Sequence, residues 1–267
     1  MRFFLAAVFL AAAFPSFALT VQDDLGRTLV LPHPAKRMIV LAPDMVETVY
    51  AIGAQSALVG VVSGADYPLA ARSITRVGSA SGLDLERIAS LHPDLILIWG
   101  PQFLRALQPF MRAGIPVYVN NPVHLQDVPL FMRRLGVLTG RPQAAARAAT
   151  RFESSLKQIT RLAKHHRERS VFFVLNAKPL MTVNGNNWIS EAIVMCGGKN
   201  IFANVALPAP EVDAEAVLAL NPDIIIKTSR ESLPGLHQKT VTLPPDLIER
   251  AGPRLVEGVL LLCRVMS

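Results

Sequence analysis

The chain has 267 residues, of which 51% are hydrophobic and 18% charged, and it carries a formal net charge of +7. This composition is typical of a folded globular protein and excludes an intrinsically disordered one. The positive charge does not indicate nucleic-acid binding, because the basic residues are spread along the chain. Their densest group, Lys164 to Arg169, lies at the end of a predicted helix, where cations interact favourably with the helix dipole.

The first 18 residues are typical of a secretory signal peptide. Arg2 supplies a positive start, an apolar stretch of 12 residues runs from Phe3 to Phe14, and Ser16-Phe17-Ala18 has the pattern of a cleavage site. The apolar stretch is too short to cross about 30 Å of hydrocarbon. No cysteine stands at the cleavage point, so a lipoprotein is not expected. We therefore expect an exported periplasmic protein that is cleaved after Ala18.

Short β-branched runs then alternate with helix-like stretches. Runs that are apolar on both faces predict parallel strands covered by helices on both sides of the sheet. These runs are Met38–Leu41, Leu58–Val62, Leu95–Ile98 and Val117–Val119 in the first half, and Val171–Leu175, Ile224–Ile226 and Val241–Leu243 in the second. The sequence therefore predicts an α/β fold with two lobes, residues 19–122 and 169–267.

A single long helix is predicted between the lobes. Residues 142–168 contain no internal proline or glycine, and apolar side chains recur at three- and four-residue spacings. At 1.5 Å per residue this helix would be about 40 Å long, enough to run along both lobes. We expect residues 123–168 to form a connecting segment in which the helix acts as a rigid spine.

An internal repeat gives the strongest evidence for two related lobes. The segment Asp84–Ile96 recurs as Asp213–Ile225, with every position shifted by 129. Each copy predicts an aspartate N-cap, a short helix ended by proline, and an aspartate before a buried strand. A weaker echo, shifted by 144, relates Glu47 to Glu191. The lobes are therefore predicted to be related but unequal.

The motifs of common enzyme classes are absent from the sequence. Leu41-Ala42-Pro43-Asp44 occupies the place of a glycine-rich nucleotide-binding turn, and no GxGxxG or Walker pattern occurs. The histidines form no HExxH pair, neither cysteine belongs to a CxxC, and there is no GxSxG elbow. We expect no catalytic residue, no protein-ligated metal and no cofactor of the protein's own.

Several individual residues have two interpretations. Cys196 and Cys263 are an even number in an exported protein, which permits one disulfide, but both could equally be small buried side chains. Trp99 at a strand end and Trp188 at a helix start could form walls of a cleft or be ordinary packing. Asp246 and Arg250 are four residues apart, and could equally form a helix pair or contact a ligand.

Segments along the whole mature chain resemble a known family. Asp23–Arg27 and the stretch from Leu31 through Pro43 resemble the start of periplasmic binding proteins for siderophores and cobalamin. The segments that resemble the cobalamin-binding branch are Gly64–Pro68, Leu85–Ile88, Cys196–Phe202 and Asp246–Arg254. The resemblance implies two Rossmann-like lobes with parallel sheets, joined by one backbone helix, with a ligand held in the cleft between them.

The resemblance also implies roles for individual residues. One glutamate on each lobe would dock onto the permease dimer of an ABC importer, and the matching positions are Glu86 and Glu215. A carboxylate in the first turn of a helix is also favoured by the helix dipole, whether or not a partner binds. Within the second lobe the resemblance implies a disulfide between Cys196 and Cys263.

Ligand contacts are implied less completely. Positions that are aromatic in the cobalamin branch fall on Gly64, Ala80, Met181 and Ala209. The remaining candidates for ligand contact are Tyr67, Trp99, Trp188, Asp246 and Arg250. We therefore predict a monomeric periplasmic protein that captures a corrinoid and delivers it to an ABC permease. A ferric siderophore or haem is the alternative ligand, and an interaction protein or an enzyme that modifies a chelate is the alternative class.

Overall fold

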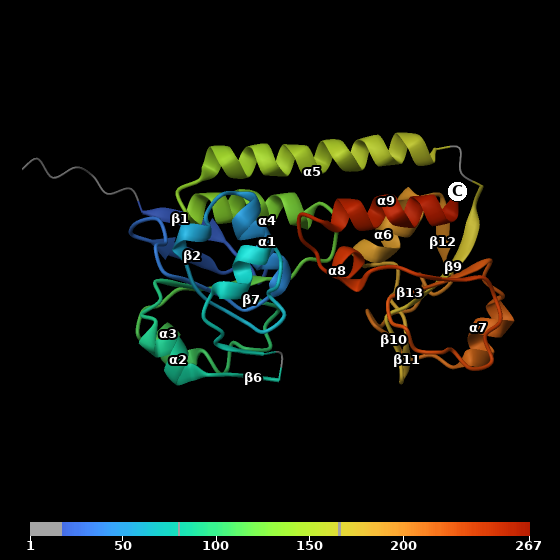
Figure 1. Ribbon diagram of the computed structural model, residues 1–267, viewed down its shortest axis with the longest axis horizontal. Coiled ribbons are helices and arrows are strands. Elements are labelled where there is room, and N and C mark those ends of the chain that lie inside the picture. The colour runs from blue at the N-terminus through green and yellow to red at the C-terminus, as the bar shows by residue number, and fades with distance from the viewer. Residues whose placement is uncertain (1–17, 80, 165–166) are drawn as a thin grey trace, which may run out of the picture.

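The computed structural model describes residues 18–79, 81–164 and 167–267. The predicted signal peptide therefore lies outside the described residues except for Ala18, and Ala80 also lies outside them. Two lobes stand side by side beneath one long helix, α5 (Pro142–Ala163), which spans both (Figure 1). Within the described ranges, no helix has the length and apolar character needed to cross a membrane.

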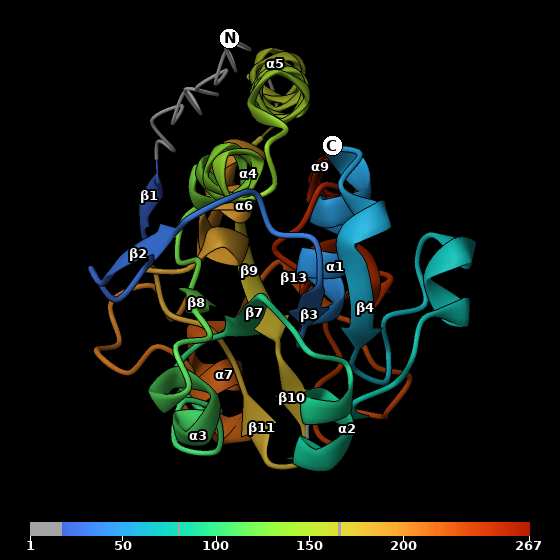
Figure 2. The same cartoon turned by 90° about the vertical axis from the view of Figure 1, so that its left-hand side faces the viewer.

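The first lobe is built on a parallel sheet of order β4-β3-β7-β8. Its strands are β3 (Met38–Val40), β4 (Leu58–Val61), β7 (Leu95–Trp99) and β8 (Val117–Asn120). Alternate residues of a strand point to opposite faces, so Met38 and Val40 join one hydrophobic cluster and Ile39 joins another. Helices cover both faces, as the doubly apolar runs predict (Figure 2).

Helices and hairpins complete the first lobe. In Figure 2, α4 and α1 lie on the α5 side of the sheet, and α2 and α3 lie on the far side. The helices are α1 (Pro43–Ala51), α2 (Leu85–Ser90), α3 (Gln108–Arg112) and α4 (Asp127–Leu138), with 3-10 turns at Gln55–Ala57 and Leu69–Ser73. The antiparallel pairs are β1 (Leu19–Gln22) with β2 (Thr28–Leu31), and β5 (Gly78–Ser79) with β6 (Gly82–Leu83).

The second lobe repeats this plan around a parallel sheet of order β12-β9-β13-β14. Its strands are β9 (Arg169–Val174), β12 (Gly198–Asn200), β13 (Ile224–Lys227) and β14 (Thr240–Thr242), with the hairpin β10 (Asn176–Ala177) and β11 (Leu180–Met181). Its helices are α6 (Trp188–Met195), α7 (Ala214–Leu220), α8 (Pro245–Ile248) and α9 (Leu255–Met266). The predicted α/β fold with two lobes and parallel sheets is thus confirmed.

Helix α5 joins the two lobes through a continuous core. One hydrophobic cluster contains strand residues of both sheets together with the buried side chains Ala145, Phe152 and Ile159 of α5. The helix packs on α4 of the first lobe and on α9 of the second. A Cβ atom at Gly136 of α4 would lie 2.3 Å from that of Ala145, so only glycine permits this approach.

The spine helix is shorter than the sequence predicts. It ends at Ala163 rather than at residue 168, which gives 22 residues and a length of about 33 Å at 1.5 Å per residue. The prediction extended too far because strand β9 already begins at Arg169, paired with Gly198. The chain therefore has to leave the helix earlier to enter the second sheet.

The internal repeat is visible in the backbone. Asp84 caps α2 by accepting the Arg87 backbone N–H at 2.9 Å, and Asp213 caps α7 by accepting that of Ala216 at 2.6 Å. The residues that follow the two helices, His92 and Asn221, have φ values of 44° and 42°. They are 129 positions apart, so the two copies share even this uncommon left-handed conformation.

The second aspartate of each copy ties its lobe's sheet together. Asp94 accepts the backbone N–H groups of Lys36 and Arg37 at 2.8 and 2.9 Å, just before β3. Asp223 accepts the backbone N–H of Ser170 at 2.7 Å, in β9. This bond holds the pKa of the Asp223 carboxyl below its usual range. Both aspartates therefore have a structural role.

Candidate functional site

A group of charged side chains connects the lobes at the base of the cleft. Glu47 of α1 is buried and accepts Arg250 Nη1–H at 3.0 Å, Arg254 Nε–H at 2.9 Å and Arg254 Nη2–H at 2.6 Å. The two arginines belong to the second lobe, so one first-lobe carboxylate receives three charge-assisted hydrogen bonds across the junction. We call Glu47, Asp66, Arg250 and Arg254 the interlobe seam.

The residues predicted from the sequence at the cleft rim meet at this seam. Arg250 also pairs with Asp66 at 3.3 Å and with Asp246 at 2.7 Å. The four-residue spacing thus does bring Asp246 and Arg250 together as an ion pair, although Arg250 lies just beyond the end of α8. Tyr67 is exposed, and the Arg254 guanidinium lies 3.9 Å from its ring centroid, a cation–π contact.

Asp44 is a buried acid at the same junction. Its Oδ2 atom has no hydrogen-bond partner among the residues the structure describes. The pKa of this carboxyl is raised to about 7. Burial is the largest cause and the nearby Glu47 adds to it, while the backbone N–H groups of Asp44 and Met45 and the charge of Arg250 oppose the rise. Gly252 of the second lobe packs directly over it, since a Cβ there would lie 3.3 Å from Asp44 Cβ.

A cavity of about 340 Å³ lies between the lobes beside the seam. The first lobe contributes the carboxyl ends of β3 and β7, where open α/β sheets place ligands. Trp99 is 38% exposed there and is accompanied by Phe103. The lining residues are Leu41, Ala42, Pro43, Asp44, Val62, Ser63, Trp99, Gln102, Phe103, Glu249, Arg250 and Ala251.

Trp188 occupies a different environment. Its side chain is buried, and its indole N–H donates to the Ile248 carbonyl at 3.0 Å. The ring therefore packs between α6 and α8 inside the second lobe. Of the two interpretations that the sequence allows for Trp188, its position favours ordinary packing over ligand contact.

Glu86 and Glu215 occupy equivalent places on the two lobes. Both side chains are exposed in the first turns of α2 and α7. These helices lie at the ends of the lobes farthest from α5 (Figure 1). No ion pair to either glutamate is formed by another described residue. Both carboxylates are thus presented to solvent on one side of the molecule.

The disulfide implied by the resemblance is confirmed. Cys196 ends α6 and is bonded to Cys263 of α9, with a Cα–Cα distance of 4.7 Å. Both cysteines are buried. The bond therefore fastens the last helix of the chain to the core of the second lobe.

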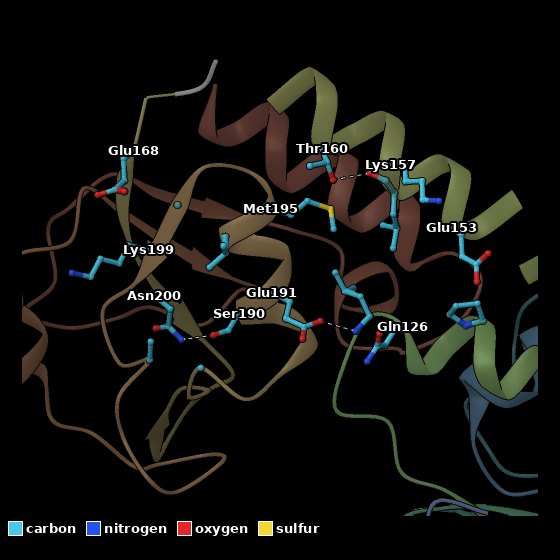
Figure 3. A pocket seen from close by; sticks show the side chains of 17 residues that line it. Gln126, Glu153, Lys157, Thr160, Glu168, Ser190, Glu191, Met195, Lys199 and Asn200 are labelled. Carbon is cyan, nitrogen blue, oxygen red and sulfur yellow. Dashed lines mark hydrogen bonds between the residues drawn. The ribbon is translucent and has the colours of Figure 1, made fainter. Parts of the chain in front are cut away.

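A larger hollow of about 890 Å³ lies on the spine side, between α4, α5, α6 and β12 (Figure 3). Here Glu191 receives the backbone N–H of Leu125 at 2.8 Å, and its Oε1 lies 2.5 Å from His124 Nδ1. Glu191 is the residue that the weaker echo relates to Glu47. Both glutamates thus hold a junction between the two halves of the chain.

Several site residues were not predicted from the sequence: Asp44, Glu47, Gln102, Phe103, Glu249 and Arg254. The echo with Glu191 singled out Glu47, although not its partners. Arg254 belongs to a segment that carries the family resemblance. In the described part of the chain no cluster of histidine, cysteine, aspartate or glutamate could hold a metal ion.

Comparisons with known proteins agree with this architecture. Residues 38–250 match the family model described as periplasmic binding protein. A vitamin B12-binding protein of Yersinia pestis (strain Pestoides F) is 32% identical over 250 residues, which covers 90% of this chain and 89% of that protein.

Solved structures show the same fold. The periplasmic vitamin B12-binding protein of Vibrio cholerae aligns with a TM-score of 0.76 at 29% identity, covering 87% of this chain and 98% of that one. A periplasmic haem-binding protein from Pseudomonas aeruginosa aligns with a TM-score of 0.71 at 22% identity, covering 87% and 92%. The second likeness concerns the fold alone.

Proposed function

Because the chain belongs to the periplasmic binding protein family, we propose that it captures a corrinoid of the cobalamin type between its lobes. The observation that carries the proposal is the similarity to a vitamin B12-binding protein along 90% of the chain. We further propose that the mature protein begins after Ala18, is not lipidated, and acts as a monomer that delivers its ligand to an ABC permease. It would make or break no bond in the ligand.

The interlobe cavity supports the ligand assignment. Trp99 and Phe103 offer flat apolar surface on the first lobe, and Tyr67 stands beside the seam. Asp246 and Arg250 offer an acceptor and donors from the second lobe. A few polar groups in a mainly apolar cleft are what orient a small ligand. A corrinoid exceeds the cavity in size, so part of it would project into the open cleft.

Calorimetric titration of residues 19–267 tests the ligand. Cyanocobalamin, cobinamide, haem and several ferric siderophores are titrated in turn. Saturable binding of a corrinoid is the expected result. Binding of haem or a siderophore alone would assign the protein to the alternative ligand class, and no binding of any of them would refute the ligand assignment.

The docking role of Glu86 and Glu215 needs a separate experiment, because either carboxylate also favours its helix electrostatically. The double variant Glu86→Gln/Glu215→Gln should keep the corrinoid affinity of the wild type, since neither residue lines the cavity. In cells that have no other protein to bind the corrinoid, the variant should support little corrinoid uptake. Glu257→Gln is the matched control, because Glu257 is also exposed in a first helical turn, on α9. Equal uptake by all three proteins would contradict docking.

A further inference from the structure

We infer that the interlobe cleft selects a chelate whose rim carries neutral amides and rejects one whose rim carries ionised carboxylates. The inference rests on the proposed function and narrows its ligand class. Its basis is the distribution of charge around the cavity, which is opposite in sign to that of the whole protein.

The cavity wall has one basic residue among its described lining, and that residue is already paired. Arg250 contacts the carboxylates of Glu47, Asp66 and Asp246 at 3.0, 3.3 and 2.7 Å. Its side chain is only 18% exposed. A ligand carboxylate could bind Arg250 only by displacing one of these three acids, of which Glu47 is buried and the other two are partly exposed.

Two further acids line the same wall. Glu249 is partly buried and its Oε1 accepts the Thr228 hydroxyl at 2.5 Å. Asp44 is buried, and its Oδ2 accepts no hydrogen bond from any described residue. Both carboxyls are partly or fully removed from water, and this burial raises the pKa of each. An additional anion in this cavity would be disfavoured for the same reason.

The neighbouring arginines do not change this balance. Arg254 is held by Glu47 and the Tyr67 ring. Arg72 and Arg76 lie outside the lining and donate to the backbone carbonyls of Asp66 and Val62. Around the cavity and the seam, five carboxyl groups (Asp44, Glu47, Asp66, Asp246 and Glu249) lie near four guanidinium groups (Arg250, Arg254, Arg72 and Arg76), so the acids exceed the arginines by one in a chain whose net charge is +7.

Amide groups suit this wall because each N–H can donate to a carboxylate and each carbonyl can accept from a neutral donor. The lining supplies Glu249 as an acceptor, and Gln102 and Ser63 as groups that both donate and accept. A rim carboxylate has no N–H to offer and would face like charges. The amide-bearing corrinoids meet this requirement, and haem, with its free propionates, does not.

The test compares ligands that differ at a single rim group. Calorimetry at pH 8 measures cyanocobalamin against its monocarboxylate, in which one rim propionamide is hydrolysed, and haem against haem dimethyl ester. A negative charge added to the ligand rim about 8 Å from the Glu249 carboxylate should weaken binding about tenfold or more at an effective dielectric constant near 20. Glu249→Gln should bring the Kd values of the two ligands in each pair closer together, and Glu257→Gln should leave the ratio of these Kd values unchanged.

The outcomes separate this inference from the proposed function. If cyanocobalamin binds and its monocarboxylates bind equally well or better, the inference is overturned while the proposed function stands. If no corrinoid binds, the proposed function fails, and the comparison of haem with its dimethyl ester then tests the inference. Tighter binding of the neutral ester supports the inference. Tighter binding of haem, equal binding of the two, or no binding of either overturns it. An unchanged ratio in Glu249→Gln would also overturn it.

Discussion

Replacing Glu47 by glutamine tests whether the seam holds the lobes together. The glutamine keeps the shape of the side chain but removes the charge on which Arg250 and Arg254 converge. Removing one partner of a buried ion pair costs about 3–5 kcal/mol. Arg250 keeps Asp66 and Asp246, and both arginines retain some exposure, 18% and 16%. We therefore expect the free energy of unfolding to fall by about 3 kcal/mol.

Glu153→Gln is the matched control. Glu153 also pairs with one arginine through two hydrogen bonds, from Arg133 at 2.8 and 3.1 Å, but these side chains are 39% and 41% exposed. Its loss should cost less than about 1 kcal/mol. Urea unfolding gives both free energies, and small-angle scattering shows whether the lobes of Glu47→Gln separate. Equal losses in the two variants would refute the reasoning, because burial would then make no difference.

The other predictions concern the disulfide and the buried acid. Cys263→Ser should lower the free energy of unfolding by up to about 4 kcal/mol, because the bond closes a loop of sequence separation 67; a urea midpoint equal to that of the wild type would contradict this. The pKa of Asp44 rises from 3.8 to about 7 on folding, so the folded state binds its proton more tightly and stability declines from about pH 4 to about pH 7. Relative to the wild type, the free energy of unfolding of Asp44→Asn should rise by roughly 3 kcal/mol between pH 5 and pH 8. A difference between the two proteins that stays constant with pH would argue against a buried charge.

The architecture could be predicted because it is encoded locally. The apolar runs at Met38–Val40 and Leu95–Ile98 describe strands buried on both faces, and the repeat describes the two capped helices. The end of α5 was placed too late because no proline or glycine stands between Ala163 and strand β9 to mark it. Only the pairing of β9 with β12 decides where the chain leaves the helix, and that pairing depends on distant residues.

The site was harder to predict because its contacts cross the junction between lobes. Glu47 and Arg254 are 207 positions apart, and nothing near either residue identifies the other. Trp188 had two interpretations for the same reason, because a tryptophan at a helix start can face the cleft or the interior. Its indole N–H donates to the carbonyl of the distant residue Ile248, and this contact places the ring in the interior. Trp99 could be placed better, because the end of a parallel strand already defines the edge of the sheet.

The core that runs beneath α5 through both lobes has a consequence for the proposed delivery of ligand to a permease. We expect this shared core and the ion pairs of the seam to restrict movement of one lobe relative to the other. The separation of Glu86 and Glu215 should then change little between the empty and the loaded protein. A permease that senses only these two carboxylates could not tell an empty carrier from a full one. Ligand-free copies of the binding protein would then compete with loaded copies for the docking site on the permease. The rate of import would depend on the fraction of copies that carry ligand and not on the number of loaded copies alone.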